Sequence, residues 1–248
     1  MTSLFSQTRR GCDLRFWLTA MAAAGLIFST YLQPMLEGLR QGGGFYEEYH
    51  NELICTAFSS DTLAAFLPAL AAIPLSAGYL EDVKSKVSRF FLIRGSYSDY
   101  LFGNCIACWL CGGGAVLLGA ISAWGITTTI FLPLERVLDN PPELGMQIVA
   151  QLTLLFLNGG LWAVLGMTMS TVMESKYIAY VSPFIVYYLL VILYERYFPD
   201  AWLLYPKNWL NPEIWPYGIG SAALFLLELT FLCGLVFYIR GKRRLEQL

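Results

Sequence analysis

Hydrophobic residues occur along this chain in long runs that are separated by short polar stretches. A helix rises 1.5 Å per residue, so about 20 apolar residues cross the roughly 30 Å hydrocarbon core of a membrane. Six runs come close to or exceed that length, and each predicts a membrane-spanning helix. They cover residues 16–35, 62–80, 100–131, 144–173, 177–195 and 219–239. The third and fourth runs are longer than a bilayer requires, so we expect them to tilt, break or project beyond it.

Prolines and small residues within these runs predict where the helices bend and where two helices pack closely. Proline removes a backbone donor, so Pro68 and Pro74 are expected to break or kink the second span and Pro183 the fifth. Small residues four positions apart allow two helices to approach closely. Such pairs occur in the third and fourth runs: Ala115 and Gly119, Gly159 and Ala163, and Gly166 and Ser170.

Segment 197–217, between the last two runs, is rich in aromatic residues and proline. It holds three tryptophans, three tyrosines and four prolines. Aromatic rings of this kind concentrate at a lipid–water interface, and proline excludes one continuous helix. Short re-entrant or interfacial helices satisfy both facts, and an aromatic surface loop is the alternative. The other long connection, 36–61, contains three consecutive glycines at 42–44 and is expected to be a loop with a hinge.

The connection between the second and third runs has the pattern of a short amphipathic helix. Within 81–91, apolar residues fall at 83, 87, 90 and 91, and charged residues occupy the other face. Two interpretations are open: a helix on the anionic surface of the inner leaflet, or a docking helix for a cytoplasmic partner. Residues 4–17 mix arginines with apolar residues, and they predict an interfacial helix before the first span or a solvated tail.

Composition supports a membrane protein. Of the 248 residues, 56% are hydrophobic and 14% are charged, whereas soluble domains are about 25% charged. The formal charge of −2 and the high hydrophobicity exclude a disordered chain and a nucleic-acid-binding protein. The fold class expected is therefore all-α: one polytopic membrane domain over residues 1–248, with six spans, an N-terminal interfacial helix, a cytoplasmic helix and re-entrant helices before the last span.

The distribution of lysine and arginine predicts the orientation of the bundle. With a cytoplasmic N-terminus, the inside segments contain Arg9, Arg10, Arg15, Lys84, Lys86, Arg89, Arg94, Lys176, Arg240, Lys242, Arg243 and Arg244, and the outside segments contain Arg40, Arg136, Arg196 and Lys207. Basic residues concentrate in cytoplasmic loops, so we expect a multi-pass protein of the cell membrane with both termini in the cytoplasm. The first run resembles a secretory signal, but its small residues 20–25 come too early for cleavage, and we expect a retained helix.

Several chemistries are excluded by residues that the sequence lacks. The only histidine, His50, lies in a polar connection, so histidine-based zinc or serine protease sites within the spans are not expected. Cys105, Cys108 and Cys111 shift around the helix by about 60° per step, and we interpret them as packing residues rather than metal ligands. No glycine-rich phosphate-binding loop occurs, so transport powered by ATP would need another polypeptide. We expect this chain to carry no catalytic residue and to bind no metal and no cofactor.

Three polar side chains within the spans are candidates for lining a pathway. Glu228 lies near the middle of the last run, where an acidic residue costs about 2.5–3.5 kcal/mol. Such residues usually face the bundle interior or a wet cavity, and Gln151 and Asn158 of the fourth run are expected partners. Glu228 is interpreted either as a substrate-contacting or proton-sensitive group, or as a structural acid hydrogen-bonded to a neighbouring helix.

The whole pattern resembles the membrane subunit of an ABC transporter of the ABC-2, or type V exporter, class. The resemblance is carried by an amphipathic segment before the first span, a long loop after it and the charged helix within 81–94. It is also carried by residues 95–100, which lead into a long third span, and by 197–217, which contains Leu210, Asn211 and Pro212. It extends over nearly the whole chain, although none of these motifs is specific alone.

The resemblance implies partners and roles. In this family the helix between the second and third spans is the coupling helix, which sits in a cleft of a separate ATPase subunit that binds ATP and Mg. The residues expected to couple to that ATPase are Asp82, Val83, Lys86, Val87, Arg89 and Phe90. Two permease copies, identical or related, would join two ATPases and form the export pathway. Members often carry a basic residue in the region of Asn104, at the start of the third span, and this chain does not, which puts details of coupling in doubt.

The size and composition resemble bacterial permeases that export peptides, antimicrobials or lipid-linked molecules, including exporters that give immunity to bacteriocins. Two other classes are alternatives: a non-catalytic membrane scaffold or sensor, and a membrane-embedded enzyme that modifies lipid. The enzyme would need a cluster of polar catalytic groups at one interface, and the polar groups of this sequence are scattered. An exporter subunit would associate with an ATPase, which a scaffold would not require.

Overall fold

The structure, a computed structural model, describes residues 2–41, 45–87, 96–136 and 144–246, and most of these are helical. Five helices are long and apolar enough to cross a membrane, or six if the bent pair α3 and α4 counts as one span. The elements are α1 (Thr2–Gly11), α2 (Leu14–Gln41), β1 (Phe45–Tyr46), α3 (Tyr49–Phe58), α4 (Asp61–Ala72), α5 (Gly78–Lys84), α7 (Tyr97–Phe131), η1 (Leu132–Leu134), β2 (Glu135–Arg136), α8 (Gly145–Met173), α9 (Lys176–Arg196), η2 (Trp202–Leu204), η3 (Pro206–Leu210), η4 (Pro212–Ile214) and α10 (Ile219–Leu245).

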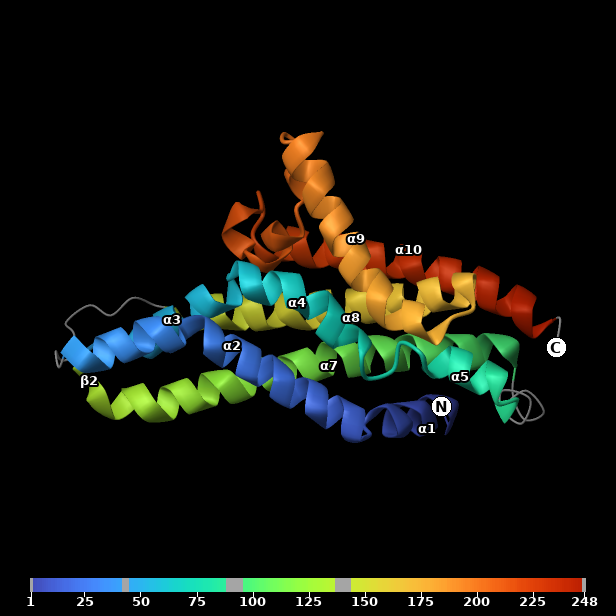
Figure 1. Cartoon of the computed structure of the whole chain (residues 1–248), viewed down its shortest axis with the longest axis horizontal. Helices are drawn as coiled ribbons and strands as arrows, with labels where there is room; N and C mark the ends of the chain where they lie inside the picture. The colour runs from blue at the N-terminus through green and yellow to red at the C-terminus, as the bar shows by residue number, and fades with distance from the viewer. Residues whose placement is uncertain (1, 42–44, 88–95, 137–143, 247–248) are drawn as a thin grey trace.

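Helices α2, α7, α8 and α10 lie roughly along the long axis of the molecule (Figure 1). Both chain termini, α1 and α5 lie at one end of this bundle, which we call the terminus end. The short parallel pair of β1 and β2 lies at the opposite end, with α3 close to it, and we call this the loop end. A separate helix, α1, precedes the first long helix α2, and the role of α1 as an interfacial helix stays a prediction.

Helix α8 is the central helix of the bundle, and small residues allow its neighbours to approach. In its most apolar window 67% of residues are buried, against 22% in α9 and 17% in α10. A β-carbon on Gly113 of α7 would overlap the carbonyl oxygen of Phe156 of α8, and one on Gly166 would overlap the carbonyl oxygen of Ala179 of α9. The predicted packing role of small residues is therefore confirmed at Gly166, and Gly113 adds a contact that the pairing pattern did not include.

The second predicted span is wrong as a single helix over 62–80. Helix α4 ends at Ala72, and a turn that contains Pro74 separates it from α5. Proline cannot donate the backbone hydrogen bond that would continue a helix, so the helix is interrupted here. Pro68, by contrast, lies inside α4, and Pro183 lies inside α9 without ending it.

The expected loop over 36–61 is also largely helical. Helix α2 continues to Gln41, and α3 packs beside α2 and α7 before a bend of 63° leads into α4. The Ser60 side chain accepts a hydrogen bond from the Leu63 amide at 3.3 Å, and this N-cap starts α4 after the bend. The predicted glycine hinge at 42–44 lies outside the described residues.

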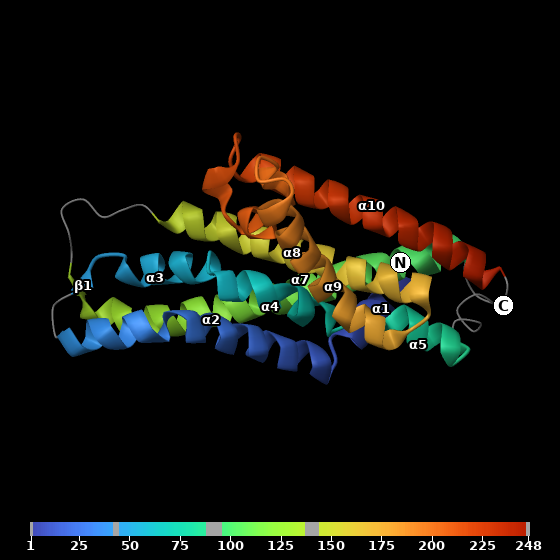
Figure 2. The same cartoon turned by 45° about the horizontal axis from the view of Figure 1, so that its top comes forward.

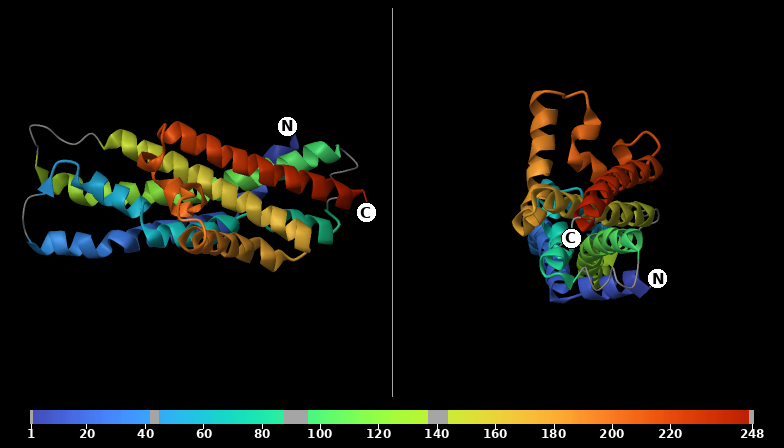
Figure 3. Two further views of the ribbon diagram at one scale, coloured as in Figure 1. Left: turned by 90° about the horizontal axis from the view of Figure 1, so that it is seen from above. Right: turned by 90° about the vertical axis from the view of Figure 1, so that its right-hand side faces the viewer.

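Helix α9 and the aromatic segment after it form an arm beside the bundle (Figures 2 and 3). The segment folds into the 3₁₀ turns η2, η3 and η4, and it meets the bundle about midway along its length rather than at the loop end. Trp209 is 3% exposed and stacks on Trp162 of α8, with ring centroids 5.8 Å apart. The segment therefore packs on α8 through Trp209, while the choice between re-entrant helices and an aromatic surface loop stays open, and insertion into a membrane stays a prediction.

Candidate functional site

A buried carboxylate connects three elements at the terminus end. Asp82 of α5 has a side chain that is only 2% exposed, and it forms an ion pair with Arg10 of α1. Its other oxygen accepts a hydrogen bond of 3.1 Å from the hydroxyl of Tyr100, in the first turns of α7. A buried carboxylate is stable only when it is paired and hydrogen-bonded, and these two contacts meet that requirement. We call Arg10, Asp82 and Tyr100 the terminus-end cluster.

Local sequence explains how the cluster forms. Helix α1 places Arg9 and Arg10 in its last turn, where basic residues favour a helix, and a β-carbon on Gly11 would overlap the Cys111 thiol of α7. The chain can therefore bring the end of α1 against α7, next to Asp82. Burial alone would lower the pKa of the Arg10 guanidinium, but the hydrogen bond and charge of Asp82 outweigh it and raise that pKa.

Further contacts join α5 to α10 and to the turn between α8 and α9. The Tyr79 hydroxyl donates to the carbonyl oxygen of Gly241 at 3.3 Å, and burial raises the pKa of Tyr79 to about 12, so the group is a neutral donor. Lys84 donates to the carbonyl oxygen of Glu174 at 3.0 Å, and Arg244 lies 3.4 Å from the carboxylate of the same residue. Side chains of α5 thus bind the backbone of α10 and of the turn between α8 and α9, in addition to the contacts of Asp82 with α1 and α7.

The predicted coupling residues do not share one exposed face. Asp82 and Val83 are buried, Lys86 is exposed, and Val87 is half-buried. Arg89 and Phe90 lie outside the described residues. In this conformation Asp82 contacts other elements of the same chain, so a partner would meet the exposed face around Lys86. Contact of this segment with an ATPase stays a prediction.

The three candidate pathway residues are not brought together. Gln151 and Asn158 are buried in α8, at 1% and 2% exposed. Gln151 donates to the Ser59 hydroxyl at 3.1 Å and so connects α8 to the bend after α3. Glu228 lies on the exposed side of α10, away from both. The expected pairing of Glu228 with α8 is therefore wrong, because α10 turns its Glu228 face away from the bundle.

The three cysteines of α7 point to three different helices. Cys111 lies against Gly11 of α1, Cys108 lies 3.4 Å from the Ala163 carbonyl of α8, and the Cys105 thiol lies beside Gly234 of α10. They therefore pack between helices rather than converge on one point. Among the residues that the structure describes, no three His, Cys, Asp or Glu side chains are placed to bind a metal ion.

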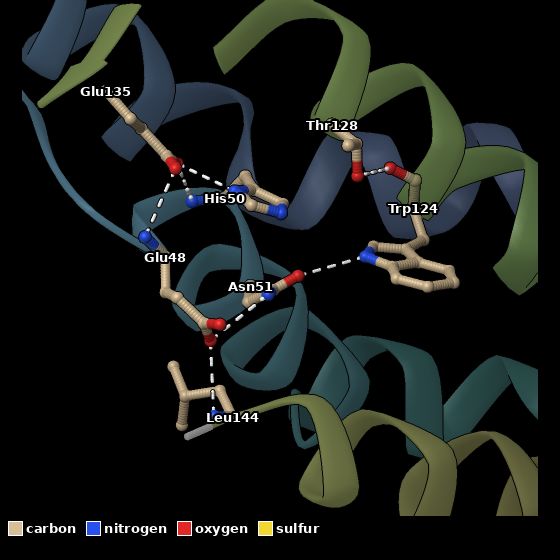
Figure 4. Close-up of polar contacts among 7 residues, drawn as sticks. All are labelled: Glu48, His50, Asn51, Trp124, Thr128, Glu135 and Leu144. Carbon is tan, nitrogen blue, oxygen red and sulfur yellow. Dashed lines mark hydrogen bonds and ion pairs between the residues drawn. The ribbon is translucent and has the colours of Figure 1, made fainter. Parts of the chain in front are cut away.

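A second polar network lies at the loop end (Figure 4). Glu135 of β2 accepts hydrogen bonds from the His50 backbone at 2.8 Å, from His50 Nδ1 at 2.7 Å and from the Glu48 backbone at 3.1 Å. Glu48 accepts from the Leu144 backbone and from Asn51, each at 3.2 Å. We call Glu48, His50, Asn51 and Glu135 the loop-end network; it joins the ends of α3, α7 and α8.

The loop-end network also offsets the free-energy cost of an unfavourable backbone conformation at Glu48. Glu48 has φ 67°, in the left-handed region that is unfavourable for residues other than glycine. Its carboxylate and backbone both take part in the network, and the Trp124 indole of α7 donates to Asn51 at 3.0 Å. Together these contacts hold the turn before α3 in that conformation.

We expect Glu135→Ala to release α3 from the bundle. A hydrogen bond to a charged group contributes about 1.5–3 kcal/mol, and the variant loses three such bonds and leaves buried donors unpaired. The test is the reactivity of Cys55, a buried thiol of α3, with a maleimide, followed by mass spectrometry of its peptide. Reactivity should rise in Glu135→Ala but not in Glu37→Ala, an exposed acid of α2 at the same end. Equal reactivity in both variants would contradict the role of Glu135.

Sequence reasoning missed the partners in both networks. Arg10 and Tyr100 lie 72 and 18 positions from Asp82, and Glu135 lies 85 positions from His50. No local pattern relates residues so far apart.

The chain was also compared with known proteins. No model of a known protein family matches it, and no curated protein matches it either. The structure itself shows that the described residues are mostly helical, with five or six helices of membrane-spanning length.

Proposed function

We propose that this chain is the membrane-spanning permease subunit of an ATP-driven exporter of the ABC-2 class. It spans the cell membrane with both termini in the cytoplasm, and two copies, or one copy and a related chain, form the pathway. A separate ATPase subunit binds ATP and Mg and associates with the terminus end. The proposal is supported by the apolar helices, by the location of both termini at one end and by the lysine and arginine residues concentrated there.

The observation that carries the proposal is the buried terminus-end cluster. A partner that displaces the segment around Lys86 displaces α5, and Asp82 connects α5 directly to α1 and α7. Movement of a short segment at one end is thereby passed to two other helices. A surface helix that only rests on lipid would not need a buried carboxylate in contact with two neighbouring elements.

Helix α7 can carry that movement to the other end of the molecule. Its 35 residues span about 52 Å at 1.5 Å per residue. Tyr100 near its start belongs to the terminus-end cluster, Trp124 near its end binds Asn51, and Glu135 follows in β2. Displacement of α7 therefore changes the loop-end network, and this provides a physical route from an ATPase to the outer side of a pathway.

Affinity purification from native membranes tests the proposal. We expect the wild-type chain to co-purify with a subunit that hydrolyses ATP, and the variant Lys86→Glu/Val87→Asp to lose that subunit, since it reverses the charge of the exposed Lys86 and adds a charge at the half-buried Val87 after α5. Arg196→Glu, a charge reversal on an exposed residue at the far end of α9, is the control and should retain the subunit. A wild-type chain that purifies without any ATPase would contradict the proposal and favour a scaffold or sensor.

A further inference from the structure

The thiols of Cys12 and Cys111 meet where the end of α1 lies against α7. Cys111 is 3% exposed, and its thiol lies within hydrogen-bonding distance of the Cys12 thiol. Cys12 is the one exposed cysteine among the six of this chain. One thiol of the pair is therefore accessible from solution, and the other is buried next to it.

The local backbone holds the two thiols in this position. The Cys12 amide donates to the Thr8 carbonyl oxygen at 3.0 Å, which continues the last turn of α1 as far as Cys12. Gly11 has no side chain, and a β-carbon there would overlap the Cys111 thiol and lie 3.5 Å from the Cys111 β-carbon. The two β-carbons of a disulfide are about 3.5–4.5 Å apart, so the backbone beside Cys12 approaches Cys111 as closely as a disulfide requires.

We propose that Cys12 and Cys111 are a redox-sensitive pair that hydrogen peroxide converts to a disulfide. The thiolate of the exposed Cys12 attacks the peroxide and gives a sulfenic acid and hydroxide, and the hydroxide takes up the proton that the thiol has lost. The Cys111 sulfur then attacks the Cys12 sulfur, the S–O bond breaks, and the oxygen leaves as water with the Cys111 proton. The two thiols lose two electrons and two protons, and the peroxide is reduced to two waters.

The position of the pair suits a reversible modification. Cys12 comes just before α2, the first long helix, at the terminus end of the molecule (Figure 1). In the proposed orientation this end faces the cytoplasm, where thiol reductants keep cysteines reduced and disulfides are transient. The link therefore forms during exposure to peroxide and is removed afterwards. Its reversal depends on the proposed orientation, whereas its formation depends only on the two side chains.

A disulfide here fixes α1 on α7 beside the terminus-end cluster. Arg10 lies two residues before Cys12, and its partner Asp82 belongs to α5. A covalent link prevents α1 from leaving α7 when α5 is displaced. The link also closes a loop of about 100 residues, and closing a long loop stabilises the folded chain. Oxidation thus makes the terminus end more rigid, which in the proposed exporter slows transport.

Peptide mapping of the full chain in detergent micelles tests the link. The protein is treated with hydrogen peroxide, unfolded in N-ethylmaleimide, digested without reductant and analysed by mass spectrometry. We expect a disulfide between Cys12 and Cys111 that dithiothreitol removes, and an alkylated Cys55, the buried thiol of α3. The proposal is overturned if Cys12 is oxidised to a sulfenic or sulfinic acid while Cys111 remains alkylated, or if Cys12 is linked to a different cysteine.

Two serine variants separate the pair from general oxidation of thiols. Cys111→Ser should accumulate a sulfenic acid at Cys12 that dimedone labels and that the wild type lacks, because the second thiol is gone. Cys108→Ser, which removes a buried thiol one turn away in α7, should form the disulfide as the wild type does. Oxidation should raise the Tm of the wild type and of Cys108→Ser but not that of Cys111→Ser.

Equal dimedone labelling of the wild type and Cys111→Ser, or a Tm of the wild type that oxidation does not raise, would count against the pair. All of these measurements use the purified chain alone. A chain that purifies without any ATPase would therefore remove the exporter function and leave the thiol pair standing.

Discussion

Gly113→Val is expected to prevent the bundle from forming a stable fold. A β-carbon at this position would overlap the Phe156 carbonyl oxygen and lie 2.9 Å from the Phe156 ring, so α7 and α8 must move apart. Overpacking a tight core costs about 1–3 kcal/mol even where side chains can adjust, and here a backbone atom is in the way. We expect little monodisperse protein on size-exclusion chromatography in detergent and a large loss in Tm.

Gly125→Val provides the matched control. Gly125 lies in the same helix, and a β-carbon there has no neighbour within 4 Å. The two variants change helix propensity equally and differ only in the space around the new side chain. Equal Tm values for Gly113→Val and Gly125→Val would mean that α7 and α8 do not pack as closely as described.

Arg10→Ala is expected to destabilise the terminus end more than Asp82→Ala. Removing Arg10 leaves the buried Asp82 carboxylate with only the Tyr100 hydroxyl, whereas removing Asp82 leaves an Arg10 side chain that is 49% exposed and solvated. Loss of one partner of a buried pair costs about 3–5 kcal/mol, and the exposure of Arg10 reduces this to about 2–3 kcal/mol. Thermal unfolding in detergent measures the difference.

Arg9→Ala and a double variant serve as controls for this experiment. Arg9 precedes Arg10 in the same turn of α1 and is exposed, so its removal should leave Tm close to that of the wild type. Arg10→Ala/Asp82→Ala should be more stable than Arg10→Ala alone, because the unpaired buried carboxylate is then gone. A double variant less stable than both single variants would show that the two side chains do not act as a pair.

Much of the helical framework could be predicted from hydropathy. The runs at 16–35, 100–131, 144–173, 177–195 and 219–239 correspond to α2, α7, α8, α9 and α10. Each of these runs is apolar over about 20 residues or more, which is the length of a membrane-spanning helix. Hydropathy therefore identifies these helices without any knowledge of how they pack. The prediction failed at 36–61 and 62–80, where α3, α4 and α5 are short.

The placement of polar side chains could not be predicted in the same way. Asp82 was expected on the charged face of an amphipathic helix, as a contact for an ATPase, and the structure buries it against Arg10 and Tyr100. Glu228 was expected in the interior, and it lies on the exposed side of α10. A periodic pattern separates a polar face from an apolar face, but it cannot identify which face meets another helix when both are largely apolar, as in α10.

Local sequence thus accounts for which segments are helical and for their length, since apolar runs, prolines and caps act over a few neighbouring residues. The packing of helices distant in sequence accounts for the rest: α8 at the centre, the aromatic turns on its side, and the terminus-end cluster and loop-end network at opposite ends of α7. These contacts join residues that lie tens of positions apart in the sequence. They also depend on how closely two helix backbones approach each other, and this distance cannot be derived from a single sequence.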